Sequence, residues 1–376
     1  MMKNQTSNTK RTVDRRSFMK SGLLTGGAAT VGVGLLANGT SAHAQFGVGD
    51  DRLDAGDIAI LRFLAAAELL ESDLWTQYAE LGGLTPNQLP LEVVQAPPMN
   101  SYQNAFLALD GDGPQYISSN TLDEVSHATF LNGYLDSKGA EPVNLDEFRT
   151  LQGSTATGST GIGRLTNLMH LNVDTSWFVR YRSATNPDFG ATFPQAININ
   201  NRTAIPITNA DFKDPNHIQV IANIAAFHFG YIEQGGASLY AALSQKVKHP
   251  EVLEITLGIG GDEIAHFLEW VDFAGNGVQA PVAPVTDHGL TFPDFFNKPP
   301  LLPPNLVQPN LIFPVPCEFI SPNLPHCAVI RPITDKFGGA VATIESFTAD
   351  GLFFGQTEKF LKTLMELAVA ADAARR

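Results

Sequence analysis

The sequence predicts an all-α protein, and the main reason is a motif that occurs twice. Asp-Glu-x-x-His is present at 123–127 and again at 262–266, each time in an apolar segment with helical periodicity. Each copy follows an earlier apolar segment that carries a glutamate, Glu68 before the first copy and Glu233 before the second. Two glutamates and two Glu-x-x-His motifs are the ligands of a two-metal carboxylate site in a four-helix bundle. The pattern therefore predicts both an architecture and a kind of site.

The first helix is expected at residues 57–82 and the second at about 114–138. In the first, Glu68 and Glu71 recur with large apolar residues at spacings of three and four, so both carboxylates lie on the apolar face. The second carries the first Glu-x-x-His copy on a stripe of apolar residues. A loop that contains several prolines separates the two helices.

Residues 139–213 contain few helix signals, and they predict a long crossover between the second and third helices. The third helix is expected to run from an Asp-Pro pair at 214–215, an N-cap followed by a proline in the first turn, to about residue 246. A Gly-Gly-Ala sequence at 235–237 allows a neighbouring helix or a ligand to approach this helix closely. The fourth helix is expected at about 250–273.

The chain differs in character on either side of residues 52–275, which we predict to be the helical domain. Residues 1–44 hold an Arg-Arg pair, a short glycine-rich apolar run and a small-residue cleavage site. They predict a signal peptide for export by the twin-arginine pathway, to the periplasm or the cell exterior, rather than a membrane anchor. Residues 276–376 are proline-rich at first, and they predict an ordered coil followed by one or two amphipathic helices at about 339–374.

Net charge and cysteine content argue against several kinds of partner and metal site. The formal net charge is −14, and removal of residues 1–44 would bring it to about −19. This acidity disfavours nucleic acid and anionic membranes as partners, and no stable membrane insertion is expected. The two cysteines, Cys317 and Cys327, predict either a short disulfide loop or two free thiols, and they argue against a cysteine metal site.

The spacing of the repeated motif has a direct chemical meaning. In Glu-x-x-His the carboxylate and the imidazole share one helix face, with about 5–6 Å between their Cβ atoms, so both can bind one ion. Four carboxylates balance the charge of two divalent ions, which an apolar interior requires. Oxygen-rich ligation with one imidazole per ion suits iron or manganese better than copper or a structural zinc. The alternative is a pair of surface Glu–His contacts that only support their helices. The predicted metal ligands are Glu68, Glu124, His127, Glu233, Glu263 and His266.

Three further acidic residues are expected to support these ligands. Asp123 and Asp262 could each hold a metal-bound histidine, either the one on the same helix or the one on the partner helix. Ordinary surface aspartates are the alternative. Glu71 is expected to support the site or to lie at its rim. The alternative is that Glu71 is an additional metal ligand that moves during turnover. His170 and His228 are expected to be structural.

At these residues the chain resembles the ferritin-like superfamily, and in particular its exported, stress-associated branch of desiccation-related proteins. The resemblance implies an up-down four-helix bundle with a long crossover between its second and third helices. It also implies that the six predicted ligands hold two divalent metal ions. The segments that carry the resemblance are residues 57–71, 122–131, 227–243 and 263–266.

The resemblance further implies redox chemistry with a small oxidant, O2 or H2O2, at a di-iron site, in a protein of oxidative or desiccation stress. Iron is favoured over manganese. A dimanganese catalase is the nearest alternative, because its ligand set is closely similar. A stress or envelope protein whose metal only stabilises the fold is an alternative of a different class. A homo-oligomer is compatible with the family, but the long crossover and the C-terminal extension disfavour a storage cage.

Overall fold

The structure is a computed structural model, and it divides the chain into two compact units, Met1–Arg52 and Leu53–Arg376. The fold below is that of the second unit. The predicted signal peptide, residues 1–44, and the predicted Cys317–Cys327 pairing lie outside the described residues. The structure describes residues 52–82, 100–109, 111, 113–161, 163–182, 193–275, 282–295, 313–315, 323–325, 327–329 and 338–375.

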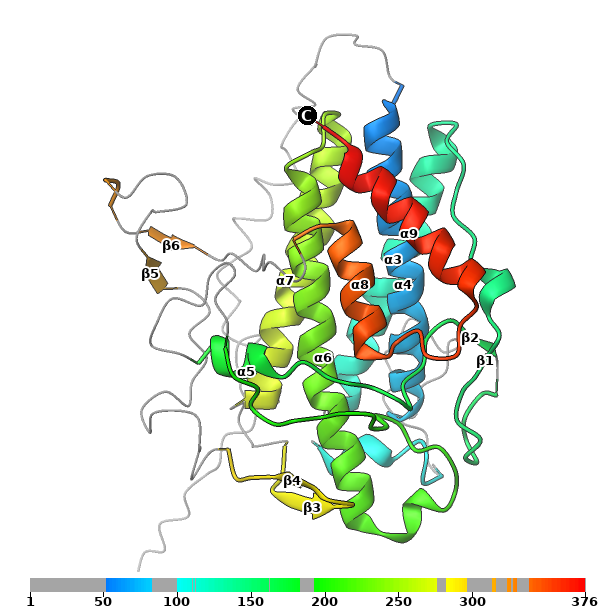
Figure 1. Ribbon diagram of the computed structural model, residues 1–376, viewed down its shortest axis with the longest axis vertical. Helices are drawn as coiled ribbons and strands as arrows, with labels where there is room; N and C mark the ends of the chain where they lie inside the picture. Colours follow the sequence, from blue (N-terminus) through cyan, green and yellow to red (C-terminus); the bar gives the residue numbers. More distant parts are fainter. Residues whose placement is uncertain are drawn as a thin grey trace, which may run out of the picture. The chain divides into compact units, whose positions relative to one another are not determined.

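The described residues are mostly helical, which confirms the predicted all-α class. The four longest helices are α3 (Ala55–Glu80), α4 (Gly113–Ser137), α6 (Pro215–Ser244) and α7 (Pro250–Gly275). α3 packs along α4, and α6 packs along α7 (Figure 1). Each begins and ends within two residues of the predicted bounds. Within the described part of the chain, none of the helices has the length and apolar character that a membrane span needs.

Capping side chains explain where two of these helices begin. Asp54 accepts a hydrogen bond from the backbone N–H of Asp57 at 2.8 Å, at the start of α3. Asp214 accepts one from the backbone N–H of Asn216 at 2.9 Å, and Pro215 follows it at the first helical position of α6. Both caps satisfy N–H groups that the first turn leaves without a partner, and proline has no such N–H to satisfy.

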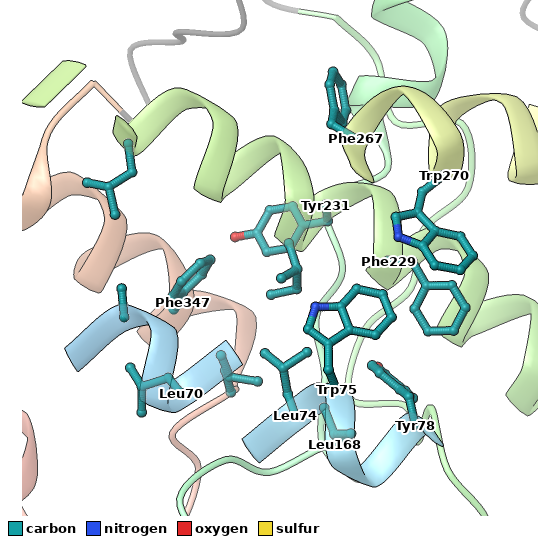
Figure 2. Close-up of a cluster of buried hydrophobic side chains, with 14 of the residues drawn as sticks. Leu70, Leu74, Trp75, Tyr78, Leu168, Phe229, Tyr231, Phe267, Trp270 and Phe347 are labelled. Atoms are coloured by element: carbon teal, nitrogen blue, oxygen red, sulfur yellow. The ribbon is translucent and has the colours of Figure 1, made fainter. Parts of the chain in front are cut away.

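An aromatic cluster fills the space between α3, α6 and α7 (Figure 2). The rings of Trp75 and Trp270 stack with 5.5 Å between their centroids, and Phe229 lies 5.1 Å from Trp75 and 4.7 Å from Trp270. The ring of Tyr78 meets that of Phe229 edge-on at 4.8 Å. All four side chains are almost completely buried, so they contribute most of their apolar area to the stability of this helix contact.

The connection from α4 to α6 is more structured than its few helix signals predict. It contains η4 (Asp146–Phe148), β1 (Leu151–Gln152), β2 (Gly163–Arg164), α5 (Ser176–Arg180) and η5 (Asp211–Lys213). β1 and β2 form an antiparallel pair. These elements have two to five residues each, so they leave no periodic pattern in the sequence.

Buried acids on α3 hold this connection in place. One carboxylate oxygen of Asp73 accepts hydrogen bonds from the backbone N–H groups of Leu165 and Thr166, at 3.0 and 2.9 Å. Its other oxygen accepts one from Arg149 at 2.7 Å. About two turns further along α3, the carboxylate of Glu80 accepts a hydrogen bond from Arg164 at 2.6 Å. Asp73 and Glu80 are therefore buried because they bind the connection. They differ in this from Glu68, which the sequence predicts to be a metal ligand.

The proline-rich segment after α7 contains two short antiparallel pairs where the structure describes it, instead of the predicted coil. β3 (Val285–Asp287) pairs with β4 (Leu290–Phe292), and β5 (Phe313–Val315) pairs with β6 (Cys327–Val329). Alternate residues of β4 are buried, and Phe292 packs against Phe227 of α6 with 6.0 Å between ring centroids. The hairpin β3–β4 is too short for its alternation to be recognised in the sequence.

The last segment forms two helices, α8 (Ala340–Asp350) and α9 (Glu358–Ala373), of which α9 packs on α3 (Figure 1). Gly351 ends α8 in the left-handed region, with φ of 89°, and a Cβ at this position would lie 2.4 Å from the carbonyl oxygen of His170. Only glycine meets both requirements. The sequence predicted one or two helices at about 339–374, and the structure has two.

His228 connects α8 to the long helices, in agreement with its predicted structural role. Its Nδ1 lies 2.6 Å from the hydroxyl of Tyr78 on α3, and its Nε2 lies 3.1 Å from a carboxylate oxygen of Asp350. His228 itself is fully buried. His170 is placed elsewhere, with its Nδ1 3.0 Å from the side-chain oxygen of Asn201.

Asp73→Asn should lower the free energy of unfolding by about 3 kcal/mol, because it weakens a buried acceptor of several hydrogen bonds and removes the charge that pairs with Arg149. Urea denaturation measures the change. Asp136→Asn, at an exposed position on α4, is the matched control and should change the free energy of unfolding by less than about 0.5 kcal/mol. Equal effects of the two substitutions would contradict the anchoring role of Asp73.

Candidate metal centre

The four longest helices each contribute to one buried acidic cluster. The structure brings all six predicted ligands together, although they come from positions far apart in the chain. Each is at most 7% exposed. Glu68 comes from α3, Glu124 and His127 from α4, Glu233 from α6, and Glu263 and His266 from α7.

Within this cluster, two sets of ligand atoms are close enough to surround an ion. In each set the atoms lie within 4.8 Å of one another. Glu124 and Glu263 belong to both sets, so their carboxylates lie between the two positions. The first ligand group is Glu68, Glu124, His127 and Glu263, and the second ligand group is Glu124, Glu233, Glu263 and His266.

Both histidines present the same nitrogen to the carboxylates. Nδ1 of His127 lies 3.4 Å from Glu124 and 3.5 Å from Glu68. Nδ1 of His266 lies 3.1 Å from Glu124 and 3.4 Å from Glu233. The ring centroids are 6.4 Å apart, so each imidazole serves its own group.

The other nitrogen of each histidine contacts an aspartate on the opposite helix. Nε2 of His127 on α4 lies 3.1 Å from Asp262 on α7, and Nε2 of His266 on α7 lies 3.3 Å from Asp123 on α4. The contact between Asp262 and the histidine of its own helix is longer, at 3.9 Å. Of the two arrangements that the sequence allowed, the structure therefore has the one between partner helices. A carboxylate at Nε2 directs the lone pair of Nδ1 toward the cluster.

The cluster contains carboxylate oxygens that no protein donor satisfies. Glu68 Oε2, Glu233 Oε2 and both carboxylate oxygens of Glu263 are buried without a hydrogen-bond partner. A buried oxygen in this condition is costly, because it has lost water and gained nothing in return. Cations satisfy such oxygens, so the donor set present in the chain fits divalent metal ions.

Burial and mutual repulsion disturb the acid–base equilibria of the cluster. Burial raises the pKa of Glu124 to about 7, and the charge of Glu233 adds to this rise. Burial also raises the pKa of Glu263 well above its usual range, with a further contribution from Glu124. For His127, burial lowers the pKa, but the hydrogen bonds with Asp262 and Glu124 outweigh this and raise it. Without a metal ion, protons are thus the positive charge that the cluster can hold.

Glu71 belongs to the cluster without being a member of either ligand group. It is only 3% exposed, so it does not lie at a solvent-exposed rim. Burial raises its pKa well above the usual range, and the charges of Glu263 and Glu124 add to the rise. Of the positions expected for Glu71, its burial favours a supporting one over the rim.

The structure adds two supporting residues that the sequence argument missed. The side-chain amide of Asn120 donates to Glu124 at 2.8 Å and to Glu233 at 3.1 Å, and its oxygen accepts from the indole N–H of Trp270 at 2.6 Å. The hydroxyl of Tyr240 donates to Glu68. Asn120 precedes Glu124 by one helical turn, a spacing that could have identified it, whereas nothing in the sequence relates Tyr240 to Glu68.

Close packing of α6 against α7 depends on a glycine. A Cβ at Gly236 would lie 2.1 Å from a carboxylate oxygen of Glu263. The predicted close approach at the Gly-Gly-Ala sequence is therefore confirmed, and the group that approaches is a candidate ligand. Any larger residue would displace this carboxylate from both ligand groups.

Fold and site together define a mostly helical protein with buried Glu/His clusters that could hold metal ions. The chain matches no family model, no curated protein and no solved structure.

The metal-free protein should lose stability as the pH rises from about 5 to about 8. A carboxyl group whose pKa is higher in the folded state binds more protons when folded, so a rising pH favours unfolding. The shift of Glu124 from 4.5 to about 7 corresponds to a change on the order of 3 kcal/mol. The raised pKa of His127 acts in the same direction. Melting temperature measured in chelator across this pH range tests the effect.

Glu124→Gln is the control for this measurement, and it should make the decline shallower. Added divalent metal should raise the melting temperature more at pH 8 than at pH 5, because protons compete with the ions for the same oxygens. A metal-free melting temperature that rises through this range would contradict the assignment.

Proposed function

We propose that this chain is a ferritin-like di-metal protein that reacts with O2 or H2O2. In this proposal α3, α4, α6 and α7 form the four-helix bundle, and the segment between α4 and α6 is its long crossover. The two ligand groups hold two divalent ions, with iron preferred to manganese. The twin-arginine pair at 15–16 supports an exported protein, and a role in oxidative or desiccation stress is part of the proposal.

One observation carries the proposal: the two ligand groups share Glu124 and Glu263. Two independent metal sites would need no common carboxylate, whereas two ions that act together are held by carboxylates between them. The remaining residues divide evenly, with Glu68 and His127 in one group and Glu233 and His266 in the other. Each position then has the same ligands, three carboxylates and one imidazole.

The ligand chemistry favours iron or manganese. Carboxylate oxygens outnumber imidazole nitrogens at both positions, which suits these ions better than copper or a structural zinc. Four ligand carboxylates neutralise two divalent ions, so the loaded cluster is tolerated in an interior from which water is excluded. Iron at such a site supplies electrons to O2 or peroxide.

The chain's own residues orient the ligands and donate hydrogen bonds to them. Asp123 and Asp262 hold the histidines with Nδ1 toward the carboxylates. The hydrogen bond from His127 keeps the pKa of Asp262 below its usual range, so this acceptor stays ionised. Burial and the charge of Glu68 raise the pKa of Tyr240 well above its usual range, so its hydroxyl remains a hydrogen-bond donor to Glu68.

The number of metal ions bound per chain should distinguish a ligand that belongs to both groups from a ligand that belongs to one. Wild-type protein should bind two Fe2+ or Mn2+ ions per chain, measured by elemental analysis after anaerobic loading. Glu124→Ala should lose both ions, because this residue belongs to both groups, while Glu68→Ala should retain the ion of the second ligand group. Glu141→Ala, at an exposed glutamate, is the matched control and should retain both. Identical losses from Glu68→Ala and Glu124→Ala would contradict a shared carboxylate.

Oxidant consumption tests the reaction. Iron-loaded wild-type protein should consume O2 or H2O2 faster than free Fe2+ under the same conditions, and Glu263→Ala should abolish the difference. Rapid release of O2 from H2O2 by the manganese-loaded protein would instead select a dimanganese catalase. If metal raises the melting temperature but no oxidant is consumed with either ion, the site is structural and the proposed activity is wrong.

A further inference from the structure

A second group of histidines and aspartates lies at the start of α6, outside the site described above. We name it the hairpin cluster: Asp211 of η5, His217 of α6, and Asp287 and His288 of the β3–β4 hairpin. His217 precedes Glu233 by 16 positions on the same helix, which separates the two sites by about 24 Å along the helix axis. Neither the ligand inventory of the repeated motif nor the proposed oxidation chemistry uses any of these residues.

Two imidazoles in this cluster converge on one carboxylate oxygen. Nδ1 of His217 lies 2.6 Å from Oδ2 of Asp287, and Nδ1 of His288 lies 2.7 Å from the same oxygen. The two rings are 5.2 Å apart. Ligand atoms of all three residues lie within 4.8 Å of one another, so one ion can contact all three. An ion pair with Asp287 would require only one of these imidazoles.

The second ring nitrogen of His217 lies near a carboxylate, as is usual for metal-bound histidines. Its Nε2 lies 3.4 Å from Oδ1 of Asp211. Oδ2 of Asp211 accepts hydrogen bonds from the backbone N–H groups of Ile207 and Thr208, at 2.7 and 2.8 Å, so this carboxylate is held in position. A fixed carboxylate at Nε2 favours the tautomer whose Nδ1 lone pair is available to an ion.

The backbone at His288 provides an independent argument. His288 and Gly289 form the two-residue turn of the β3–β4 hairpin, with φ of 43° and 78°. Such a turn needs positive φ at both positions and is normally built from asparagine, aspartate and glycine. Histidine is less common there than asparagine or glycine, and the turn places its imidazole against Asp287. The carbonyl oxygen of His288 accepts a hydrogen bond from Arg202 at 2.9 Å, which fixes the turn.

We propose that the hairpin cluster is a second, separate metal site, which binds a divalent ion of the zinc type through His217, Asp287 and His288. Two nitrogen ligands and one carboxylate oxygen suit zinc and its neighbours in the transition series better than magnesium or calcium. Three protein ligands leave a fourth position for water, since His288 is 71% exposed. The ion would fasten the hairpin to the beginning of α6, and Asp211 would act as the positioning residue for His217.

Zinc binding to the full-length, chelator-treated chain tests this proposal. Calorimetric titration with Zn2+ should show that wild-type protein binds one more ion than His288→Asn, a variant that retains the turn because asparagine tolerates positive φ. Asp211→Asn should lower the affinity of that ion by about 10- to 100-fold, and His288→Asn should lower it further. Co2+ in place of Zn2+ should give a visible absorption spectrum from which His288→Asn removes one component.

Two controls separate this site from others. His170→Asn removes a histidine outside the cluster and should leave the zinc count unchanged. Glu124→Ala, which should empty the buried centre, should still bind the ion that His288→Asn loses. Equal zinc counts for wild type and His288→Asn, or an equal loss from His170→Asn, would overturn the proposal. Neither outcome bears on the buried centre, because its test depends on Glu124→Ala and Glu68→Ala and not on His288→Asn or His170→Asn.

Discussion

The repulsion among buried carboxylates is the constraint on which the rest of this structure depends. Five glutamates from four helices are buried close together, and several of their oxygens have no protein donor. The surrounding side chains limit this cost without removing it: Asn120 donates to two of the glutamates, Tyr240 donates to a third, and the histidines supply hydrogen bonds from α4 and α7. The remaining negative charge has to be balanced by protons or metal ions. The helix packing that buries these carboxylates therefore also gives the protein its capacity to bind ions.

The sequence predicted the long helices and the cluster because both depend on strong local patterns. Glu68, Glu124, Glu233 and Glu263 lie on apolar faces with helical spacing, and an acid on such a face has to be buried when the face packs. The short elements were missed for the opposite reason. The β3–β4 hairpin and α5 span too few residues to show periodicity, and their positions are determined by contacts such as that of Phe292 with Phe227.

Long-range partners could not be read from the sequence. Asp73 and Glu80 are buried acids on the same helix as Glu68 and Glu71, yet their partners lie in the connection between α4 and α6. Tyr240 reaches Glu68 across 172 positions of the chain, and no local rule pairs them. The choice between two partners for Asp123 and Asp262 likewise required the relative placement of α4 and α7.

The contacts between α4 and α7 also determine when, during folding, the ligand groups become complete. His127 and Asp262 are separated by 135 positions, and His266 and Asp123 by 143. Neither the half of the chain with α3 and α4 nor the half with α6 and α7 contains a complete ligand group, because each half lacks the carboxylate and the aspartate that the other provides. A complete ligand group therefore forms only when the two halves dock. An ion held by a complete ligand group would therefore be found only in molecules whose two halves have docked.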